Sequence, residues 1–106
     1  MLNGIHKIHL IGIAGSGMRA IANILICKGY EVSGSDLAES STTEKFRSMG
    51  ATIHIGHDAS YVNGVDAVVR STAIREDNPE LKAAREQGIT VLHRSDIVKA
   101  VLDVTD

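Results

Sequence analysis

A glycine-rich turn between a short apolar run and a helical pattern constrains the fold of this chain more than any other feature of its sequence. Residues 8–13 form an almost unbroken apolar run of the kind that parallel sheets bury on both faces. The run leads into a turn that carries Gly12, Gly15 and Gly17. Apolar residues then recur at helical spacing until Gly29, which is placed to end a helix. This segment predicts a strand, a glycine turn and a helix.

The same order of strand and helix repeats along the rest of the chain. Residues 41–44, Ser-Thr-Thr-Glu, form a capping-box sequence at the start of a second helix. Asn78 and Pro79 supply an N-cap and a proline at the first helical position of a third, and Ser95 is expected to cap a last one. Further strands are predicted at residues 30–34, 52–55, 67–69 and 89–92.

This alternation predicts the fold class. Strands that alternate with helices imply right-handed crossovers, so we expect an α/β, Rossmann-like three-layer domain with a five-stranded parallel sheet and helices on both faces. Cys27 lies in the first helix beside apolar neighbours and is expected to be a core residue. The apolar faces of the first and last helices are predicted to consist of Met18, Ile21, Ala22, Leu25, Ile97, Val98, Val101 and Leu102.

Length and composition fit one such domain. A chain of 106 residues has the size of one compact unit, and no linker interrupts it, so we interpret residues 1–106 as a single domain. The hydrophobic and charged fractions, 43% and 23%, are typical of a globular protein. The net charge is −2 and no basic run occurs, so nucleic acid is not expected as a partner.

The single cysteine and the amino terminus indicate the compartment. One cysteine excludes an internal disulfide and is too few for a structural zinc site. Residues 1–7 lack the pattern of a signal peptide, and no apolar run approaches the roughly 18 residues of a membrane span. We therefore expect a cytoplasmic chain with no membrane partner and no metal.

Four segments of the chain are predicted to lie where such sheets bind ligands. Ligands sit beyond the carboxyl ends of the strands, where the chain order reverses. The glycine turn, residues 35–36, residues 56–57 and residues 71–73 all follow predicted strands. The residues we expect to bind a ligand are Ala14, Gly15, Ser16, Gly17, Met18, Ser35, Asp36, His57, Ser71, Thr72 and Ala73.

The glycine turn has the character of an anion site. Without side chains its backbone can approach a phosphate, and the N–H groups of the following helix point the same way. Asp36 follows at about the distance of the ribose-binding acid in dinucleotide folds. The alternative is that the glycines only allow close packing and that Asp36 only ends a strand. For Ser35, Ser71 and Thr72 the alternative is turn and cap chemistry, and for His57 a plain loop position.

No catalytic apparatus is visible. The chain has no Gly-x-x-x-x-Gly-Lys-Ser/Thr loop for ATP and no convincing pair of nucleophile and base, so we expect no catalytic residue and no cofactor site. His9 lies inside the first strand and is expected to be a packed structural residue. The chain is thus predicted to bind a ligand without transforming it.

Three segments together resemble a known family. Residues 8–18 and 29–36, and residues 71–74 followed by Asp-Asn-Pro-Glu at 77–80, are similar in order and spacing to the amino-terminal domain of the Mur ligases. The resemblance extends from His6 to about Val101. This combination is far more specific than the glycine turn alone.

The resemblance implies a function. In this family the amino-terminal domain holds the UDP part of UDP-N-acetylmuramate, ATP phosphorylates the substrate carboxylate, and an amino acid, here L-alanine, attacks the acyl phosphate. ATP and Mg²⁺ bind in a central domain, and a carboxyl-terminal domain completes the enzyme. Neither domain is expected within these 106 residues, so the chain is interpreted as a ligase fragment that does not catalyse alone.

Two departures from the family pattern affect the predicted site. Ala14 stands where the family usually has glycine, and its methyl group either narrows the space for the diphosphate or is tolerated. Arg70 places a cation at the end of the fourth strand, where it either pairs with the diphosphate or is a surface charge. The alternative functions are an NAD(P)-binding domain of an oxidoreductase and a nucleotide-sensing regulatory module.

Overall fold

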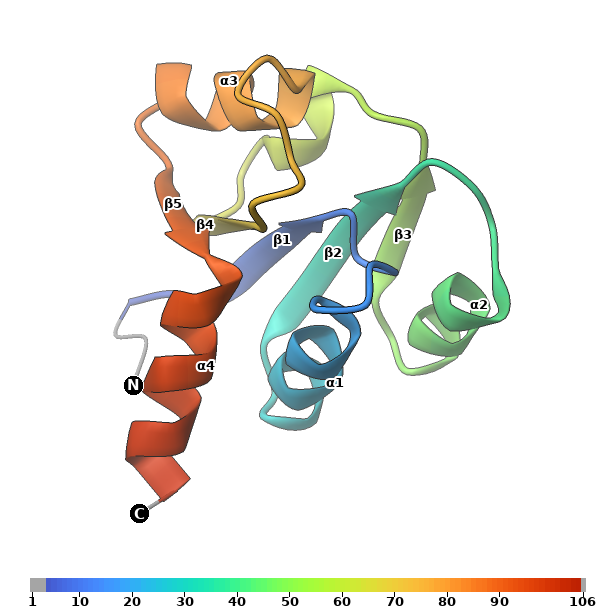
Figure 1. Cartoon of the computed structure of the whole chain (residues 1–106), viewed down its shortest axis with the longest axis vertical. Coiled ribbons are helices and arrows are strands. Elements are labelled where there is room, and N and C mark those ends of the chain that lie inside the picture. The colour runs from blue at the N-terminus through green and yellow to red at the C-terminus, as the bar shows by residue number, and fades with distance from the viewer. Residues whose placement is uncertain (1–3, 106) are drawn as a thin grey trace.

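The molecule is built on one parallel sheet. The computed structural model describes residues 4–105, with the side chains of residues 4–99. All neighbouring strands are parallel, in the order β3-β2-β1-β4-β5 (Figure 1). The strands are β1 (Lys7–Ile11), β2 (Glu31–Asp36), β3 (Thr52–Ile55), β4 (Ala67–Arg70) and β5 (Thr90–His93).

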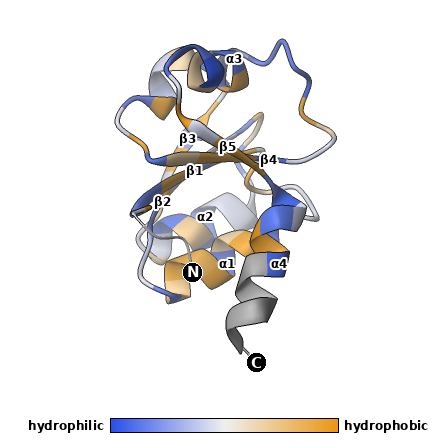
Figure 2. Cartoon of the chain, turned by 90° about the vertical axis from the view of Figure 1, so that its left-hand side faces the viewer, coloured by the Kyte–Doolittle hydropathy of each residue, from blue (hydrophilic) through white to orange (hydrophobic). Residues whose placement is uncertain are grey.

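Helices cover both faces of this sheet. Figure 2 shows α3 on one face and α1, α2 and α4 on the other. A short 3₁₀ helix, η1, packs against α3. The predicted fold class, a five-stranded parallel sheet between two helical layers, is confirmed. The helical elements are α1 (Arg19–Cys27), α2 (Ser41–Ser48), η1 (Ala59–Val62), α3 (Pro79–Glu86) and α4 (Arg94–Thr105).

The two faces of the sheet bury two hydrophobic clusters. Side chains alternate along a strand, so Ile8 and Leu10 of β1 join the cluster under α1, α2 and α4. Ile11 points to the opposite face and packs with Val68 and Leu81 under α3. β1 contributes to both clusters because it is the central strand, which explains its nearly continuous apolar sequence.

The strand order creates a crevice beside β1. The chain passes from β1 to β2 and β3 on one side, then returns to place β4 and β5 on the other. The loops after β1 and β4 therefore leave the sheet side by side and diverge onto opposite faces. This is the switch point at which open α/β sheets bind ligands.

Gly34 allows the glycine turn to lie against the sheet. A Cβ atom at Gly34 would lie 2.6 Å from Cδ1 and 2.7 Å from Cβ of Ile13. Ile13 itself is fully buried in the cluster under α1. The absence of a side chain in β2 thus makes room for the residue that anchors the turn after β1.

Two helices begin before their predicted positions, α2 by one residue and α4 by two. Ser40, not Ser41, caps α2: its hydroxyl accepts from the Thr43 N–H, and the Thr43 hydroxyl accepts from the Ser40 N–H. The last helix begins at Arg94, directly after β5, so Ser95 is not its cap. The cap there is His93, whose ring accepts from the Ser95 N–H while Asp96 accepts from the His93 N–H.

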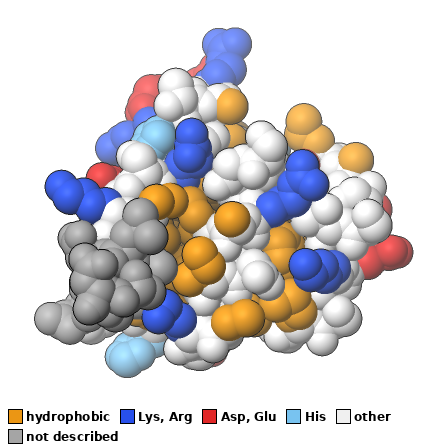
Figure 3. Space-filling view, turned by 60° about the horizontal axis from the view of Figure 1, so that its bottom comes forward, with side chains coloured by type: hydrophobic (Ala, Val, Ile, Leu, Met, Phe, Trp, Pro, Cys, Tyr) orange, Lys and Arg blue, Asp and Glu red, His pale blue; other side chains and the backbone are white. Residues whose placement is uncertain are grey.

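Two residues expected in the core are exposed. Cys27 is the last residue of α1 and faces solvent, so its predicted core position is wrong. Val98 is 40% exposed, whereas Ile97 is buried as predicted. Figure 3 shows further hydrophobic side chains at the surface on the side of the molecule that carries α1 and α2. Val101 and Leu102 lie outside the residues with described side chains.

Candidate functional site

A pocket of about 570 Å³ occupies the crevice at the switch point. It is lined by Gly12 and residues 14–18 of the glycine turn, by Asp36 at the end of β2, by residues 71–74 after β4, and by Arg94 at the start of α4. The contributing loops follow β1, β2, β4 and β5. The pocket therefore exists only when the whole sheet is assembled.

The glycine turn is held to β2 by its own backbone. The N–H groups of Gly12 and Ile13 both donate to the Ser35 carbonyl, at 2.8 and 3.0 Å. The Ala14 N–H donates to Oδ2 of Asp36 at 2.9 Å. Gly12 has a φ of +73°, a conformation that favours glycine, and this allows the chain to reverse directly after β1.

Two N–H groups of the turn are left unused. The Gly15 N–H donates to the Gly12 carbonyl, and the Met18 N–H donates to the Gly15 carbonyl. Within residues 4–105, the N–H groups of Ser16 and Gly17 have no hydrogen-bond partner. Both residues line the pocket, so the turn offers two free donors to a ligand. The positive end of the α1 dipole strengthens their attraction for an anion.

Asp36 is fixed at the rim of the pocket. One carboxylate oxygen accepts from the Ala14 N–H, and the other accepts from the Leu37 N–H at 2.8 Å. Each oxygen retains acceptor capacity, because an ionised carboxylate has about four lone-pair sites. Asp36 thus stabilises the turn and can still accept hydrogen bonds from sugar hydroxyls.

Arg70 stabilises the pocket wall that residues 71–74 form. Its guanidinium donates to the carbonyls of Ser71 and Ile74, and it pairs with Glu76 at 2.9 Å. Arg70 does not line the pocket. Arg70 thus fixes the conformation of residues 71–74, and its pairing with the diphosphate stays a prediction.

The cation that does line the pocket is Arg94. A Cβ atom at Gly17 would lie 2.8 Å from Nε and 3.1 Å from Cζ of Arg94. The guanidinium therefore packs directly on Gly17. The sequence analysis missed this residue because Ser95 was expected to cap α4, which placed Arg94 in a preceding loop.

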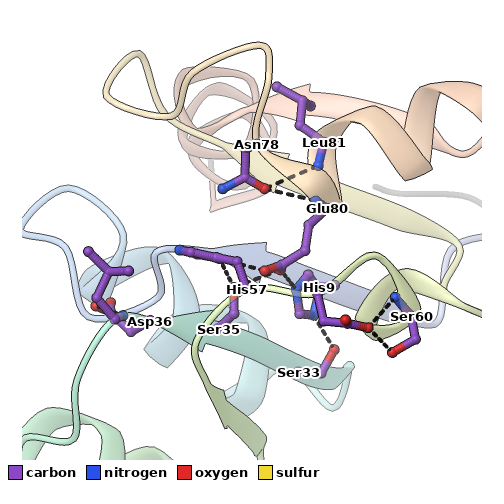
Figure 4. Close-up of polar contacts among 11 residues, drawn as sticks. His9, Ser33, Ser35, Asp36, His57, Ser60, Asn78, Glu80 and Leu81 are labelled. Atoms are coloured by element: carbon purple, nitrogen blue, oxygen red, sulfur yellow. Dashed lines mark hydrogen bonds and ion pairs between the residues drawn. The ribbon is translucent and has the colours of Figure 1, made fainter.

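Ser35 and His57 meet on the opposite face of the sheet, around the buried carboxylate of Glu80. Oε1 of Glu80 accepts from Ser35 Oγ at 2.7 Å, and Oε2 contacts Nδ1 of His57 at 2.5 Å (Figure 4). Nε2 of His9 lies 2.5 Å from Oε1. We call these four residues the Glu80 cluster.

Glu80 is fully buried, and its hydrogen bonds favour the charged form of its carboxyl group. Burial alone would raise the pKa of Glu80, but the hydrogen bonds from His9, Ser35 and His57 outweigh it and lower the pKa. Asn78 caps α3 through the Glu80 and Leu81 N–H groups, which places Glu80 in the first helical turn. Sequence analysis missed this role, because its only local signal is an acid at a helix start.

His9, His54 and His93 make contacts that stabilise the fold. His9 is fully buried and also contacts Ser33 through Nδ1 at 2.9 Å, so its predicted structural role is confirmed. His54 stacks on Tyr61 with ring centroids 4.0 Å apart. His93 contacts Thr72 through Nε2 at 3.0 Å, which ties the pocket wall to the start of α4.

The structure brings nine of the eleven predicted binding residues to one pocket. Ser35 and His57 lie outside its lining, and their predicted contact with a ligand stays a prediction. The lining residues that sequence analysis missed are Gly12, Ile74 and Arg94.

The described residues contain neither a metal cluster nor a membrane-spanning helix. Among the described residues, no group of three or more His, Cys, Asp or Glu side chains is arranged to hold a metal ion. No helix within the described part of the chain has the length and apolar character needed to cross a membrane. The pocket is therefore the candidate site within the described part of the chain.

The sequence is similar to curated ligases. The family model described as "Mur ligase family, catalytic domain" matches residues 7–104. A UDP-N-acetylmuramate--L-alanine ligase of Solidesulfovibrio magneticus is 49% identical over 102 residues, or 96% of the chain. A ligase with the same name from Burkholderia ambifaria is 50% identical over 91 residues, or 86% of the chain. The chain spans 22% and 20% of the lengths of these two relatives.

A solved structure has the same architecture. The crystal structure of a UDP-N-acetylmuramate-alanine ligase from Thermotoga maritima superposes with a TM-score of 0.86 and 34% sequence identity. The match covers 92% of this chain and 23% of that protein.

Proposed function

The chain belongs to the Mur ligase family, whose model spans residues 7–104, and on that premise we propose that it binds the UDP part of UDP-N-acetylmuramate. The observation that carries the proposal is the pair of free N–H groups at Ser16 and Gly17. Both residues line a pocket at the switch point of the sheet, where α/β domains bind nucleotides.

The geometry supports an orientation for the nucleotide. The diphosphate would accept hydrogen bonds from the Ser16 and Gly17 N–H groups, with the hydroxyls of Ser71 and Thr72 on the opposite wall. The ribose would lie beside Asp36, whose carboxylate can accept from its hydroxyls. Leu37 is 76% exposed next to Asp36 and offers an apolar surface to the base.

We place the chemical step outside this chain. In the proposed ligase, ATP with Mg²⁺ would activate the carboxylate of UDP-N-acetylmuramate, and the amine of L-alanine would attack it. The names of the relatives support L-alanine as the amino acid. The role of this domain would be to hold one end of the substrate.

A titration followed by amide chemical shifts tests the proposal. UDP and UDP-N-acetylmuramate should both shift the amide signals of Ser16 and Gly17, because those N–H groups change from free donors to bonded ones. Signals on the far face of the sheet, such as that of Leu81, should move little. Absence of any shift at millimolar nucleotide, or shifts confined to the α3 face, would contradict the proposal.

A parallel titration with NADH addresses the alternative function. The family match favours a uridine nucleotide over a dinucleotide. We therefore expect NADH to shift the same signals only at higher concentration than UDP. Saturation by NADH at lower concentration than UDP would instead support an NAD(P)-binding domain.

A further inference from the structure

Arg94 differs from most arginines of the chain in having no acidic partner. Arg47, Arg70, Arg75 and Arg85 each pair with a carboxylate within 4.0 Å. Within the described residues, Arg94 makes no such pair and its side chain donates no hydrogen bond. It is nevertheless half-buried and lines the pocket. A half-buried guanidinium without a counter-charge is costly unless a ligand supplies the charge.

The place of Arg94 is determined by its neighbours. It is the first residue of α4, and the preceding residue, His93, is bonded to both Thr72 and Asp96. This arrangement links the start of α4 to the pocket wall formed by residues 71–74. Its guanidinium lies on Gly17, because a Cβ at that position would come within 3.1 Å of Nε, Cδ and Cζ.

The guanidinium and the free amides thus converge. Gly17 carries one of the two unused N–H groups of the turn, so the charge of Arg94 lies beside a backbone donor that faces the same pocket. The carboxylate of Asp36 is engaged with Ala14 and Leu37. Positive charge and a free donor therefore lie together at Gly17, whereas the carboxylate of Asp36 is engaged by other N–H groups of the chain.

We propose that Arg94 binds the diphosphate of the nucleotide and determines the preference of the pocket for a nucleoside diphosphate over the nucleoside. This inference rests on the proposed function, because it assumes the same ligand and pocket. A guanidinium forms two parallel hydrogen bonds with phosphate oxygens, and such charge-assisted bonds are about twice as strong as neutral ones. Arg94 would bind the diphosphate from beside the Gly17 amide, on which its guanidinium packs.

Comparison of three ligands on matched variants tests the proposal. The dissociation constants of UDP, uridine and inorganic pyrophosphate are measured by amide shifts for the wild-type chain, Arg94→Ala, Arg94→Lys and Arg75→Ala. Arg75 is an exposed arginine paired with Asp77 outside the pocket, so its replacement is the control for loss of one positive charge. Dispersed amide spectra confirm that each variant is folded.

The proposal predicts a selective loss. Arg94→Ala should weaken UDP and pyrophosphate about 10- to 100-fold, the range for hydrogen bonds to charged groups, and leave uridine within about twofold. Arg94→Lys should recover part of the loss, because it restores charge but not the bidentate geometry. Arg75→Ala should bind all three ligands as the wild type does.

The outcomes separate two kinds of failure. Equal UDP affinity in the wild type and Arg94→Ala would overturn the role of Arg94 and leave the proposed function standing. An equal loss for UDP and uridine would also overturn it, because it would indicate general damage to the pocket. If the wild type binds pyrophosphate through Arg94 but does not bind UDP, the proposed function fails while the anion site at Arg94 stands.

Discussion

The two faces of the sheet use similar polar residues at the same edge for opposite purposes. Ser35 and Asp36 are neighbours in β2 and therefore point to opposite faces. Asp36 lines the pocket, where the N–H groups of Ser16 and Gly17 have no partner within the described chain. Ser35 belongs to the Glu80 cluster, and among the described residues no buried side-chain polar atom lacks a partner. One face is arranged to receive a ligand and the other is already saturated.

The helices explain this difference. The start of α3 covers the strand ends on its face, and Glu80 in its first turn supplies the acceptor that His9 and Ser35 require. On the other face, α1 and α4 both begin at the pocket, so the positive ends of two helices border an open space. Whether a strand end binds a ligand or closes a core therefore depends on what covers it.

The largest expected effect is a loss of stability when Glu80 is removed from the α3 face of the sheet. Glu80→Ala leaves His9, Ser35 and His57 without their acceptor, and each buried polar group left unsatisfied costs about 1 to 3 kcal/mol of unfolding free energy. Urea denaturation measures the change. Glu86→Ala, at an exposed position of the same helix, is the control and should change stability by less than about 0.5 kcal/mol. A loss below about 1 kcal/mol for Glu80→Ala would mean that the cluster is not needed for the fold.

A substitution on the open face should change binding and not stability. Gly17→Ala places a methyl group against the flexible end of Arg94, which can move aside. We expect UDP to bind about tenfold more weakly, equivalent to about 1.4 kcal/mol, because Arg94 is displaced from the diphosphate. The urea midpoint should stay close to that of the wild type. A large loss of stability with unchanged affinity for UDP would show that Gly17 serves the fold and not the binding of the ligand.

The unfolding free energy at acid pH should depend on the Glu80 cluster. The pKa of Glu80 is lowered in the folded chain, so its contribution is present above the unfolded pKa, near 4.3, and is lost as the pH falls through the folded value. Unfolding free energies from pH 7 to pH 3 should therefore fall less steeply in Glu80→Gln than in the wild type. Parallel curves for the two proteins would show that folding does not lower the pKa of Glu80. This effect is the smallest of the three, because it develops only in acid.

The sheet and most of the pocket could be predicted from the sequence because their signals are local. The strand at residues 52–55 begins and ends where predicted. The glycine turn and residues 71–73 meet because the order of parallel strands places their carboxyl ends together. Local patterns and one topological rule were sufficient for these features.

The Glu80 cluster could not be predicted, because its members lie far apart in the chain. His9 and Glu80 are separated by 71 residues, and no local pattern relates them. The loop after β3 turns toward α3, which takes His57 away from the pocket lining and into contact with Glu80. Arg94 was missed for a different reason: a histidine cap is uncommon, so the start of α4 was predicted two residues too late.

A crystal structure of the chain grown with UDP tests the central claim most directly. We predict diphosphate oxygens at hydrogen-bonding distance, about 2.7 to 3.2 Å, from the backbone nitrogens of Ser16 and Gly17, with the guanidinium of Arg94 on the same group. The ribose should lie beside Asp36. A nucleotide bound on the α3 face, or a pocket left empty at saturating UDP, would contradict the account.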